Sequence, residues 1–312
     1  MDLIAYIILL IGLFIAEYLY ICFARSIGAV HKCAQRDSHQ RPTVVGGGVV
    51  FYVAALVAFG LDVCKDWWLI GGITALAAIS FVDDLRPQKV LTRLIVQALS
   101  CSAILYSADC SLWWLIPALI FINACNFMDG INGLAGGYNA LLLVSIIVAD
   151  YTLGIAIHPL IIYTLAACIV FCFFNMRTHP LCFAGDVGSI TAAAIALWLL
   201  ASLMTATGSL AYLVFVAVYI ADSCLTIIHR IILRRPIWHA HRMHLYEILS
   251  NEVGLPHLLT TAIYITIQLI INIGFLILSV DPYIYLGGVV ALLSAIYIVL
   301  IRRFFPLHKL TD

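Results

Sequence analysis

The sequence predicts an all-α, polytopic membrane protein, and three observations lead to this prediction. Hydrophobic residues make up 64% of the 312 residues and charged residues only 10%, whereas soluble domains contain about 45–50% apolar and about 25% charged residues. The apolar residues form long runs, which in a bilayer must be helices because every backbone polar group needs an internal partner. Basic residues are almost confined to alternate connections. Residues 1–312 are therefore expected to form a single domain within the lipid bilayer.

The apolar runs predict about 10–11 transmembrane helices, several of them shorter than the roughly 20 residues of an ideal span. The first run, Leu3 to Phe23, has no basic leader and is predicted to span the membrane instead of serving as a signal peptide. The expected spans are 3–23, 44–61, 67–82, 93–108, 112–124, 138–149, 154–174, 188–206, 209–229, 258–280 and 283–304.

The charges of the connections orient these helices. Fifteen of the sixteen Lys and Arg residues fall on one side of the predicted membrane, and Lys65 alone falls on the other. Because cytoplasmic loops are enriched in basic residues, the first side is predicted to be cytoplasmic and the N-terminus to lie on the other side. The motif-bearing loops also lie on the predicted cytoplasmic side. The formal net charge of zero gives no indication of nucleic-acid binding.

Two motifs mark the second and third spans. Gly47 is the centre of a triple glycine at a predicted helix start, where free backbone N–H groups favour anions; a flexible turn is the alternative. Asp83 and Asp84 end the third span and repel each other unless a cation lies nearby. Mg²⁺, or a substrate held by basic residues such as Arg93, would stabilise the pair. A solvated acidic turn is the alternative here.

The most specific stretch follows the fifth span. Asn123, Asn126 and Asp129 are three residues apart and are predicted to share one helix face. Gly130 and a second glycine then break the predicted helix, with Asn132 between them. A structural turn would not need this density of carboxamides and carboxylates, so the stretch predicts a binding site at the membrane surface.

Two later loops add an acid and a basic cluster. Asp186 lies between two glycines before the eighth span, where a helix N-cap is the plain explanation and a Mg²⁺ ligand the functional one. The last predicted cytoplasmic loop contains His239, His241, Arg242 and His244. Zinc is a rival ligand for these histidines. The arginine among them favours an anionic group such as a diphosphate.

A transporter for an anionic solute is the alternative from another functional class. Transporters place polar residues along a path at mid-membrane, whereas here the polar residues cluster at one surface. Asp222 and Glu17 are the deeper exceptions. Asp222 is expected to face the protein interior, and its pairing with His229 or Arg230 is a purely structural reading.

These motifs and their order in the chain resemble those of the polyprenyl-phosphate N-acetylhexosamine-1-phosphate transferases. The matching motifs are Pro-Thr…Gly-Gly-Gly, Asp-Asp, Asn-x-x-Asn-x-x-Asp-Gly-x-Asn-Gly, Phe-x-Gly-Asp-x-Gly-Ser and a late His/Arg loop, within about residues 36 to 250. The last loop looks most like the branch that initiates O-antigen synthesis. It lacks a triple His, which counts against a MurNAc-pentapeptide substrate, and Val45 stands where relatives of that branch often carry Arg.

The resemblance implies a Mg²⁺-dependent enzyme, with Mn²⁺ as a substitute, in the bacterial inner membrane. It would transfer a sugar 1-phosphate from a UDP-sugar to undecaprenyl phosphate and release UMP. UDP-GlcNAc is the commonest donor, and the 6-deoxy donors UDP-N-acetylfucosamine and UDP-N-acetylquinovosamine stay open. Direct attack by the lipid phosphate and a two-step route through a phospho-aspartate both stay open. Relatives are often dimers, so a homodimer is an expected assembly.

The resemblance also assigns roles to positions of this chain. Asp186 and Asn126 would bind Mg²⁺, Phe183 would stack on uracil and Asn132 would read the uracil edge. The remaining expected site residues are Gly47 near the nucleotide, Asp83, Asp84 and Arg93 at the acceptor phosphate, His241, Arg242 and His244 at the diphosphate or sugar, and Asp129, whose role varies among relatives.

Overall fold

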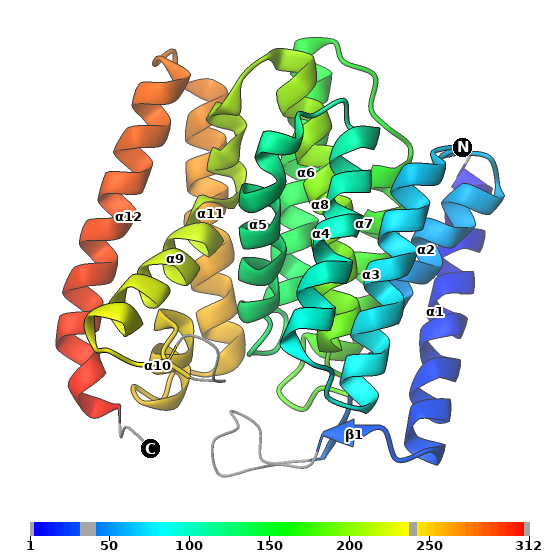
Figure 1. Ribbon diagram of the computed structural model, residues 1–312, viewed down its shortest axis with the longest axis horizontal. Coiled ribbons are helices and arrows are strands. Elements are labelled where there is room, and N and C mark those ends of the chain that lie inside the picture. The colour runs from blue at the N-terminus through cyan, green and yellow to red at the C-terminus, as the bar shows by residue number, and fades with distance from the viewer. Residues whose placement is uncertain (1–2, 32–41, 237–241, 309–312) are drawn as a thin grey trace.

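The computed structural model describes residues 3–31, 42–236 and 242–308, and helices dominate this part of the chain (Figure 1). The helices are α1 (Leu3–Ser26), α2 (Val49–Gly60), α3 (Trp67–Leu85), α4 (Val90–Ser107), η1 (Leu112–Trp114), α5 (Leu115–Phe127), α6 (Leu134–Leu153), α7 (Leu160–Asn175), α8 (Gly185–Thr207), η2 (Leu210–Val216), α9 (Ala217–Ile232), α10 (Leu245–Asn251), α11 (His257–Ile277), α12 (Pro282–Phe304) and η3 (Phe305–Leu307).

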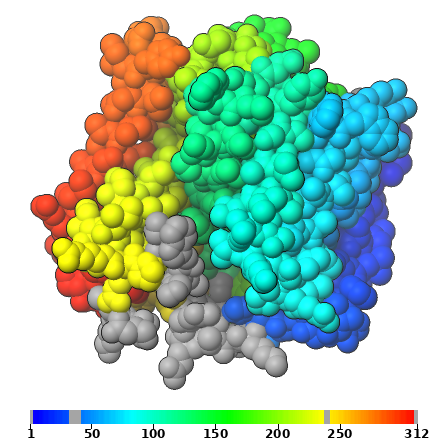
Figure 2. Space-filling model, in the orientation of Figure 1, coloured from blue at the N-terminus to red at the C-terminus, as the bar shows by residue number. Residues whose placement is uncertain are grey.

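The helices confirm the prediction of an all-α, polytopic membrane protein. Within the described residues, eight helical segments are long and apolar enough to cross a membrane. Three shorter apolar helices, Val49–Gly60, Leu112–Phe127 and Leu160–Asn175, coincide with the remaining predicted spans. Helix α1 begins at one end of the bundle and α12 ends at the other, as an odd number of crossings requires (Figure 1). In Figure 2, α12 forms one edge of the molecule, and α1 and α2 form the opposite edge.

Helix α8 lies at the centre of the bundle. Almost all of its residues are buried, and it packs against α2, α3, α4, α5 and α6. Its sequence is rich in alanine, whose small side chain lets neighbouring helices approach closely where no hydrophobic force distinguishes protein from lipid. The first turn of α8 carries Asp186, so the most buried helix also positions a predicted site residue.

The segment 210–232 is a broken helix. The short helix η2 ends at Val216, and α9 continues from Ala217 in a direction inclined to the rest of the bundle (Figure 1). Gln268 of α11 satisfies the backbone at the break: its Oε1 accepts the N–H of Val218 at 2.9 Å, and its Nε2 donates to the carbonyl of Val214 at 2.8 Å. A neighbouring helix thus replaces the helical hydrogen bonds that the break removes.

Two short strands hold loops together at the end of the bundle where α3 ends and α8 begins. β1 (Val30–His31) pairs antiparallel with β2 (Thr43–Val44) in the register Val30 to Val44 and His31 to Thr43. Val44 also forms a parallel bridge with Cys182. The exit of α1, the approach to the triple glycine and the loop before α8 therefore meet at one place.

Three local predictions were wrong. Helix α5 ends at Phe127, so Asp129 lies beyond the helix and does not share a face with Asn123, and Gly130 does not break it. The N-cap of α8 is Ala184, and Asp186 is the second helical residue. The polar residues of both motifs therefore lie at helix ends, where the 3.6-residue periodicity no longer fixes their direction.

Candidate active site

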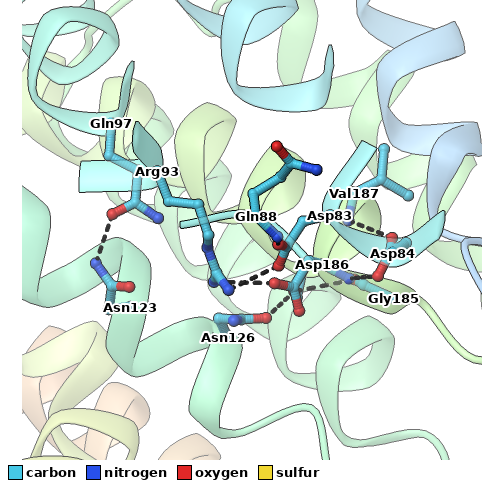
Figure 3. A network of polar contacts seen from close by, with 11 residues as sticks. Asp83, Asp84, Gln88, Arg93, Gln97, Asn123, Asn126, Gly185, Asp186 and Val187 are labelled. Atoms are coloured by element: carbon cyan, nitrogen blue, oxygen red, sulfur yellow. Dashed lines mark hydrogen bonds and ion pairs between the residues drawn. The ribbon is translucent and has the colours of Figure 1, made fainter. Parts of the chain in front are cut away.

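Arg93 joins two carboxylates that come from different helices. Its Nη1 donates to Asp83 Oδ2 at 2.6 Å, and its Nη2 donates to Asp186 Oδ2 at 3.0 Å (Figure 3). Asp83 is near the end of α3, Arg93 is in the first turn of α4 and Asp186 is in the first turn of α8. The predicted association of Arg93 with the acidic motifs is therefore present, although 93 residues separate Arg93 from Asp186.

Asp84 is turned toward the backbone of α8. Its two oxygens accept the N–H groups of Asp186 at 2.9 Å and Val187 at 3.0 Å. These N–H groups have no partner within the helix, and a carboxylate at a helix N-terminus also interacts favourably with the helix dipole. Asp84 thus fixes the start of α8 and the position of Asp186. Asp83, by contrast, receives Arg93 and the N–H of Gln88, the latter at 2.6 Å.

Asn126 completes the group of predicted metal ligands. Its Oδ1 accepts the hydroxyl of Ser189 at 2.5 Å, and its amide lies within hydrogen-bonding reach of the Asp186 carboxylate. Asn123 lies apart from this group, because its Nδ2 donates to Gln97 at 3.1 Å and to the carbonyl of Leu119 at 2.8 Å. Of these two asparagines, therefore, it is Asn126 that links the last turn of α5 to the start of α8.

The predicted nucleotide residues lie in two connected loops. The carbonyl of Phe183 accepts the N–H of Gly47 at 2.8 Å, which ties the triple glycine to the loop before α8. The Phe183 ring is half-buried, with its centroid 6.2 Å from that of His31. Asn132 is only 2% exposed and donates to the carbonyl of Arg177 at 2.7 Å. The uracil contacts of Phe183 and Asn132 stay predictions.

The basic loop is described from Arg242 onward, and His241 lies outside the described residues, as does His239. His244 is 2% exposed, and its Nδ1 lies 3.5 Å from Oδ1 of Asp222. The centroid of the His244 ring lies 5.9 Å from that of the Phe127 ring. Arg242, two residues before His244, is half-buried. The described part of this loop therefore packs beside the end of α5, next to Asn126.

The structural reading of Asp222 as a partner of His229 or Arg230 was wrong. The Asp222 carboxylate accepts hydrogen bonds from residues of α10 and α11, and the Arg230 guanidinium donates to the carbonyl of Pro236. Residues seven apart on one helix share a face, but the donors to this carboxylate come from α10, from α11 and from Thr226, one turn further along α9.

Comparison with known proteins finds two similarities. The profile of glycosyl transferase family 4 matches residues 67–204. A probable undecaprenyl-phosphate N-acetylglucosaminyl 1-phosphate transferase of Bacillus subtilis (strain 168) is 23% identical over 305 residues, covering 88% of this chain and 84% of that protein. The chain is thus similar to glycosyl transferase family 4 over residues 67–204, and to one undecaprenyl-phosphate sugar-phosphate transferase over most of its length.

The part that matches the family 4 profile contains most of the candidate site. Eight of the twelve predicted site residues fall within residues 67–204, namely Asp83, Asp84, Arg93, Asn126, Asp129, Asn132, Phe183 and Asp186. Gly47 and the His/Arg loop lie outside it. The carboxylate, guanidinium and carboxamide cluster of Figure 3 therefore lies within the part of the chain that the profile covers.

Asn175 is a residue near the site that sequence reasoning did not single out. Asn175, at the end of α7, accepts the N–H of Gly133 at 2.7 Å and donates to the carbonyl of Cys182 at 2.9 Å. It thus joins the loop of Asn132 to the loop of Phe183. The only signal in the sequence is a carboxamide at the end of an apolar run, where an unpaired polar group would be unfavourable.

The donor atoms of the candidate site fit Mg²⁺. Asp186 and Asn126 offer carboxylate and carboxamide oxygens side by side, and Mg²⁺ takes one or two carboxylates together with substrate phosphates and water. In the described ranges no group of three or more His, Cys, Asp or Glu side chains is placed to hold a metal ion. A metal here would therefore draw ligands from Asn126 and the substrate as well as from Asp186.

Asp129 is expected to reduce the stability of the fold at neutral pH. Burial raises the pKa of Asp129 well above its usual value, and the charges of Asp186 and Asp84 raise the pKa further. The folded state therefore holds the proton more tightly than the unfolded chain, whose aspartates have a pKa of about 3.9. The free energy of unfolding is therefore undiminished below a pH of about 3.9. It falls as the pH rises from there toward the pKa of Asp129 in the folded state.

Asp129→Asn is expected to raise the free energy of unfolding at pH 7.5 by at least about 1 kcal/mol and to reduce transfer activity. Thermal unfolding at pH 4 and pH 7.5 measures the first effect, and the stabilisation should disappear at the lower pH. The exposed Asp109 provides the control, since Asp109→Asn should change stability at neither pH. An Asp129→Asn variant less stable than the wild type at pH 7.5 would contradict the burial argument.

Proposed function

We propose that this protein transfers N-acetylglucosamine 1-phosphate from UDP-GlcNAc to undecaprenyl phosphate and releases UMP, in a Mg²⁺-dependent reaction. The reaction would take place at the cytoplasmic face of the bacterial inner membrane, as the first membrane step of O-antigen or related cell-envelope polysaccharide synthesis. The match of residues 67–204 to glycosyl transferase family 4 and the similarity to the probable undecaprenyl-phosphate N-acetylglucosaminyl 1-phosphate transferase of Bacillus subtilis support the reaction class.

The observation that carries the proposal is the Arg93 bridge between Asp83 and Asp186, beside Asn126 (Figure 3). Phosphoryl transfer depends mainly on positioning and on neutralising the charge of the phosphoryl oxygens. Here a cation, two acidic side chains and a carboxamide converge from four helices at one end of an apolar bundle. Such a site suits two anionic substrates, one of which reaches it from the surrounding lipid.

The proposed chemistry is a direct displacement. An oxygen of the acceptor phosphate forms a bond to the β-phosphorus of the donor, and the bond between that phosphorus and the bridging oxygen breaks, so that UMP leaves with the bridging oxygen. A phosphate monoester has a second pKa of about 6 and is largely ionised at neutral pH. Asp83 would accept the remaining proton when the acceptor arrives singly ionised, since Asp84 is engaged with the start of α8.

The other side chains position the donor in this proposal. Arg93 would leave its carboxylate partners in part to contact phosphate oxygens, for which its planar guanidinium is well suited. Bound by Asp186 and Asn126 together with the diphosphate, Mg²⁺ would supply Lewis-acid polarisation of the phosphoryl oxygens. Arg242 and His244 would contact the diphosphate or the sugar, and Phe183 the uracil ring.

A transfer assay on purified protein tests the proposal. With undecaprenyl phosphate, Mg²⁺ and UDP-GlcNAc we expect a lipid-linked sugar and an equal amount of UMP. EDTA should abolish both products, and added Mg²⁺ should restore them. Parallel reactions with UDP-N-acetylfucosamine and UDP-N-acetylquinovosamine assign the donor. Folded protein that forms no product with any of the three donors would contradict the proposed activity.

A further inference from the structure

We infer that Asp222 is a positioning residue, which holds the His244 loop against the loop that follows α5 and so shapes the binding site for the sugar diphosphate. This inference rests on the proposed function, because it assigns the substrate whose binding Asp222 affects.

The Asp222 side chain is buried in the middle of a group of donors. It is 3% exposed and belongs to α9. Its Oδ2 accepts the hydroxyl of Tyr264 at 2.6 Å, and its Oδ1 accepts the hydroxyl of Thr226 at 3.1 Å. A carboxylate without partners in this environment would be strongly unfavourable, whereas one that accepts several hydrogen bonds fixes the elements that supply the donors.

The carboxylate also defines where α10 begins. Oδ1 accepts the N–H of Leu245 at 2.9 Å, and Oδ2 lies 3.3 Å from the N–H of Tyr246. These are the first two residues of α10, whose backbone N–H groups have no partner within the helix. His244, the residue before α10, lies 3.5 Å from Oδ1 through its Nδ1. Asp222 thus contacts three consecutive residues and orients the end of the basic loop.

Helix α10 transmits this position to the candidate site. The hydroxyl of Tyr246 donates to the carbonyl of Phe127 at 2.8 Å, and Phe127 directly follows Asn126. The Tyr246 ring also lies so close to Gly130 that a Cβ on that glycine would come within 3.1 Å of ring carbons. The contacts therefore run without a gap from Asp222 through Tyr246 to the end of α5, which carries Asn126, and to the following loop, which carries Asp129.

This arrangement gives Asp222 a role that differs from general stabilisation. A purely structural residue would affect the amount of folded protein and leave the kinetics of the folded fraction unchanged. A positioning residue for the diphosphate should raise the KM for the donor and leave the KM for the lipid acceptor unchanged. The two roles are therefore separable by measuring the two KM values independently on protein whose folded fraction is known.

The test compares Asp222→Asn with the wild type. The variant keeps one acceptor oxygen but places an amide where the second acceptor was, so that the start of α10 loses part of its support. We expect the KM for UDP-GlcNAc to rise at least tenfold, the KM for undecaprenyl phosphate to change less than twofold, and the protein to remain folded. Asp222→Ala, which removes both acceptors, should show a larger rise.

Asn272→Ala is the matched control. Asn272 is a buried side chain of α11 that also makes two hydrogen bonds, one with Ser145 at 2.8 Å and one with Gln268 at 2.6 Å, away from the candidate site. The Asn272→Ala variant should be less stable than the wild type, and neither KM should change. A double-mutant cycle of Asp222→Asn with Tyr246→Phe adds a second readout, since residues on one contact path should show non-additive changes in donor KM.

Three outcomes would overturn the inference. Equal changes in both KM values, unchanged kinetics, or loss of folding in Asp222→Asn would each leave Asp222 with a structural role only. Failure of the proposed function is a different result, in which the wild-type protein itself forms no product.

Discussion

Asp186→Ala is expected to reduce sugar-phosphate transfer by at least about 10³-fold, the upper range for removing one preorganised electrostatic contact at a reacting centre. The Asp186 carboxylate receives Arg93 and lies beside Asn126, so its removal eliminates both a proposed Mg²⁺ ligand and the partner that holds the guanidinium. The acceptor and donor phosphates would then meet a site with one acidic side chain fewer and a less fixed cation.

The same substitution should leave the fold intact. Asp186 is the second residue of α8, and its N–H, not its side chain, is what Asp84 holds. Alanine is the best helix former and keeps that N–H. Asp186→Asn should retain the shape of the side chain and still lose most activity, because the charge is absent. Transfer rates in a saturating UDP-GlcNAc assay, with thermal unfolding of each variant, measure both expectations.

Asp281 provides the matched control for loss of an acid at a helix start. It caps α12 at the end of the bundle far from Arg93, accepting the N–H groups of Tyr283 at 2.9 Å and Ile284 at 3.0 Å. Asp281→Ala should lower stability by about 1 kcal/mol and leave transfer unchanged. If Asp186→Ala retained near wild-type transfer, the proposed metal ligand would be wrong, whatever the control showed.

The fold could be predicted from the sequence because apolar length and loop charge are local signals. Each predicted span coincides with a helix or with a 3₁₀ segment followed by a helix, and most ends agree within a few residues. Helix α10 was missed, since its seven residues, Leu245–Asn251, are too few to show a periodic pattern. The break between η2 and α9 was missed as well, because it depends on Gln268 from another helix.

The sequence predicted which residues gather at the candidate site, but not which groups each of them contacts. The motifs identified Asp83, Asp186 and Asn126, which the structure brings together. The sequence could not show that Asp84 faces the backbone of α8, 102 residues away, or that Asp222 faces α10. Pairing across such distances is decided by how helices pack, and no local pattern records it. The described residues begin again at Arg242, so His241 remains a prediction from the sequence alone.

Gly188→Ala is expected to destabilise the protein by about 3 kcal/mol or more, as overpacking of a rigid contact does at its upper range. The starts of α2 and α8 touch through Gly48 and Gly188. A Cβ on Gly188 would lie 3.1 Å from the carbonyl carbon of Gly48 and 3.0 Å from the Cβ of Ala184. Gly48 also donates its N–H to the Ala184 carbonyl at 3.1 Å. Backbone cannot yield as a flexible side chain can, so the two helix starts would have to separate.

That separation should also lower activity, because it would pull the Gly47 N–H away from the Phe183 carbonyl and shift the first turn of α8, which carries Asp186. Gly287→Ala is the control: Gly287 lies within α12, and its added Cβ would meet no atom within 4 Å. There alanine should be neutral or stabilising by up to about 1 kcal/mol through its helix propensity. Thermal unfolding of both variants measures the difference. Equal stability of Gly188→Ala and Gly287→Ala would mean that the contact between α2 and α8 is looser than the backbone approach implies, and that the position of Asp186 depends on Asp84 alone.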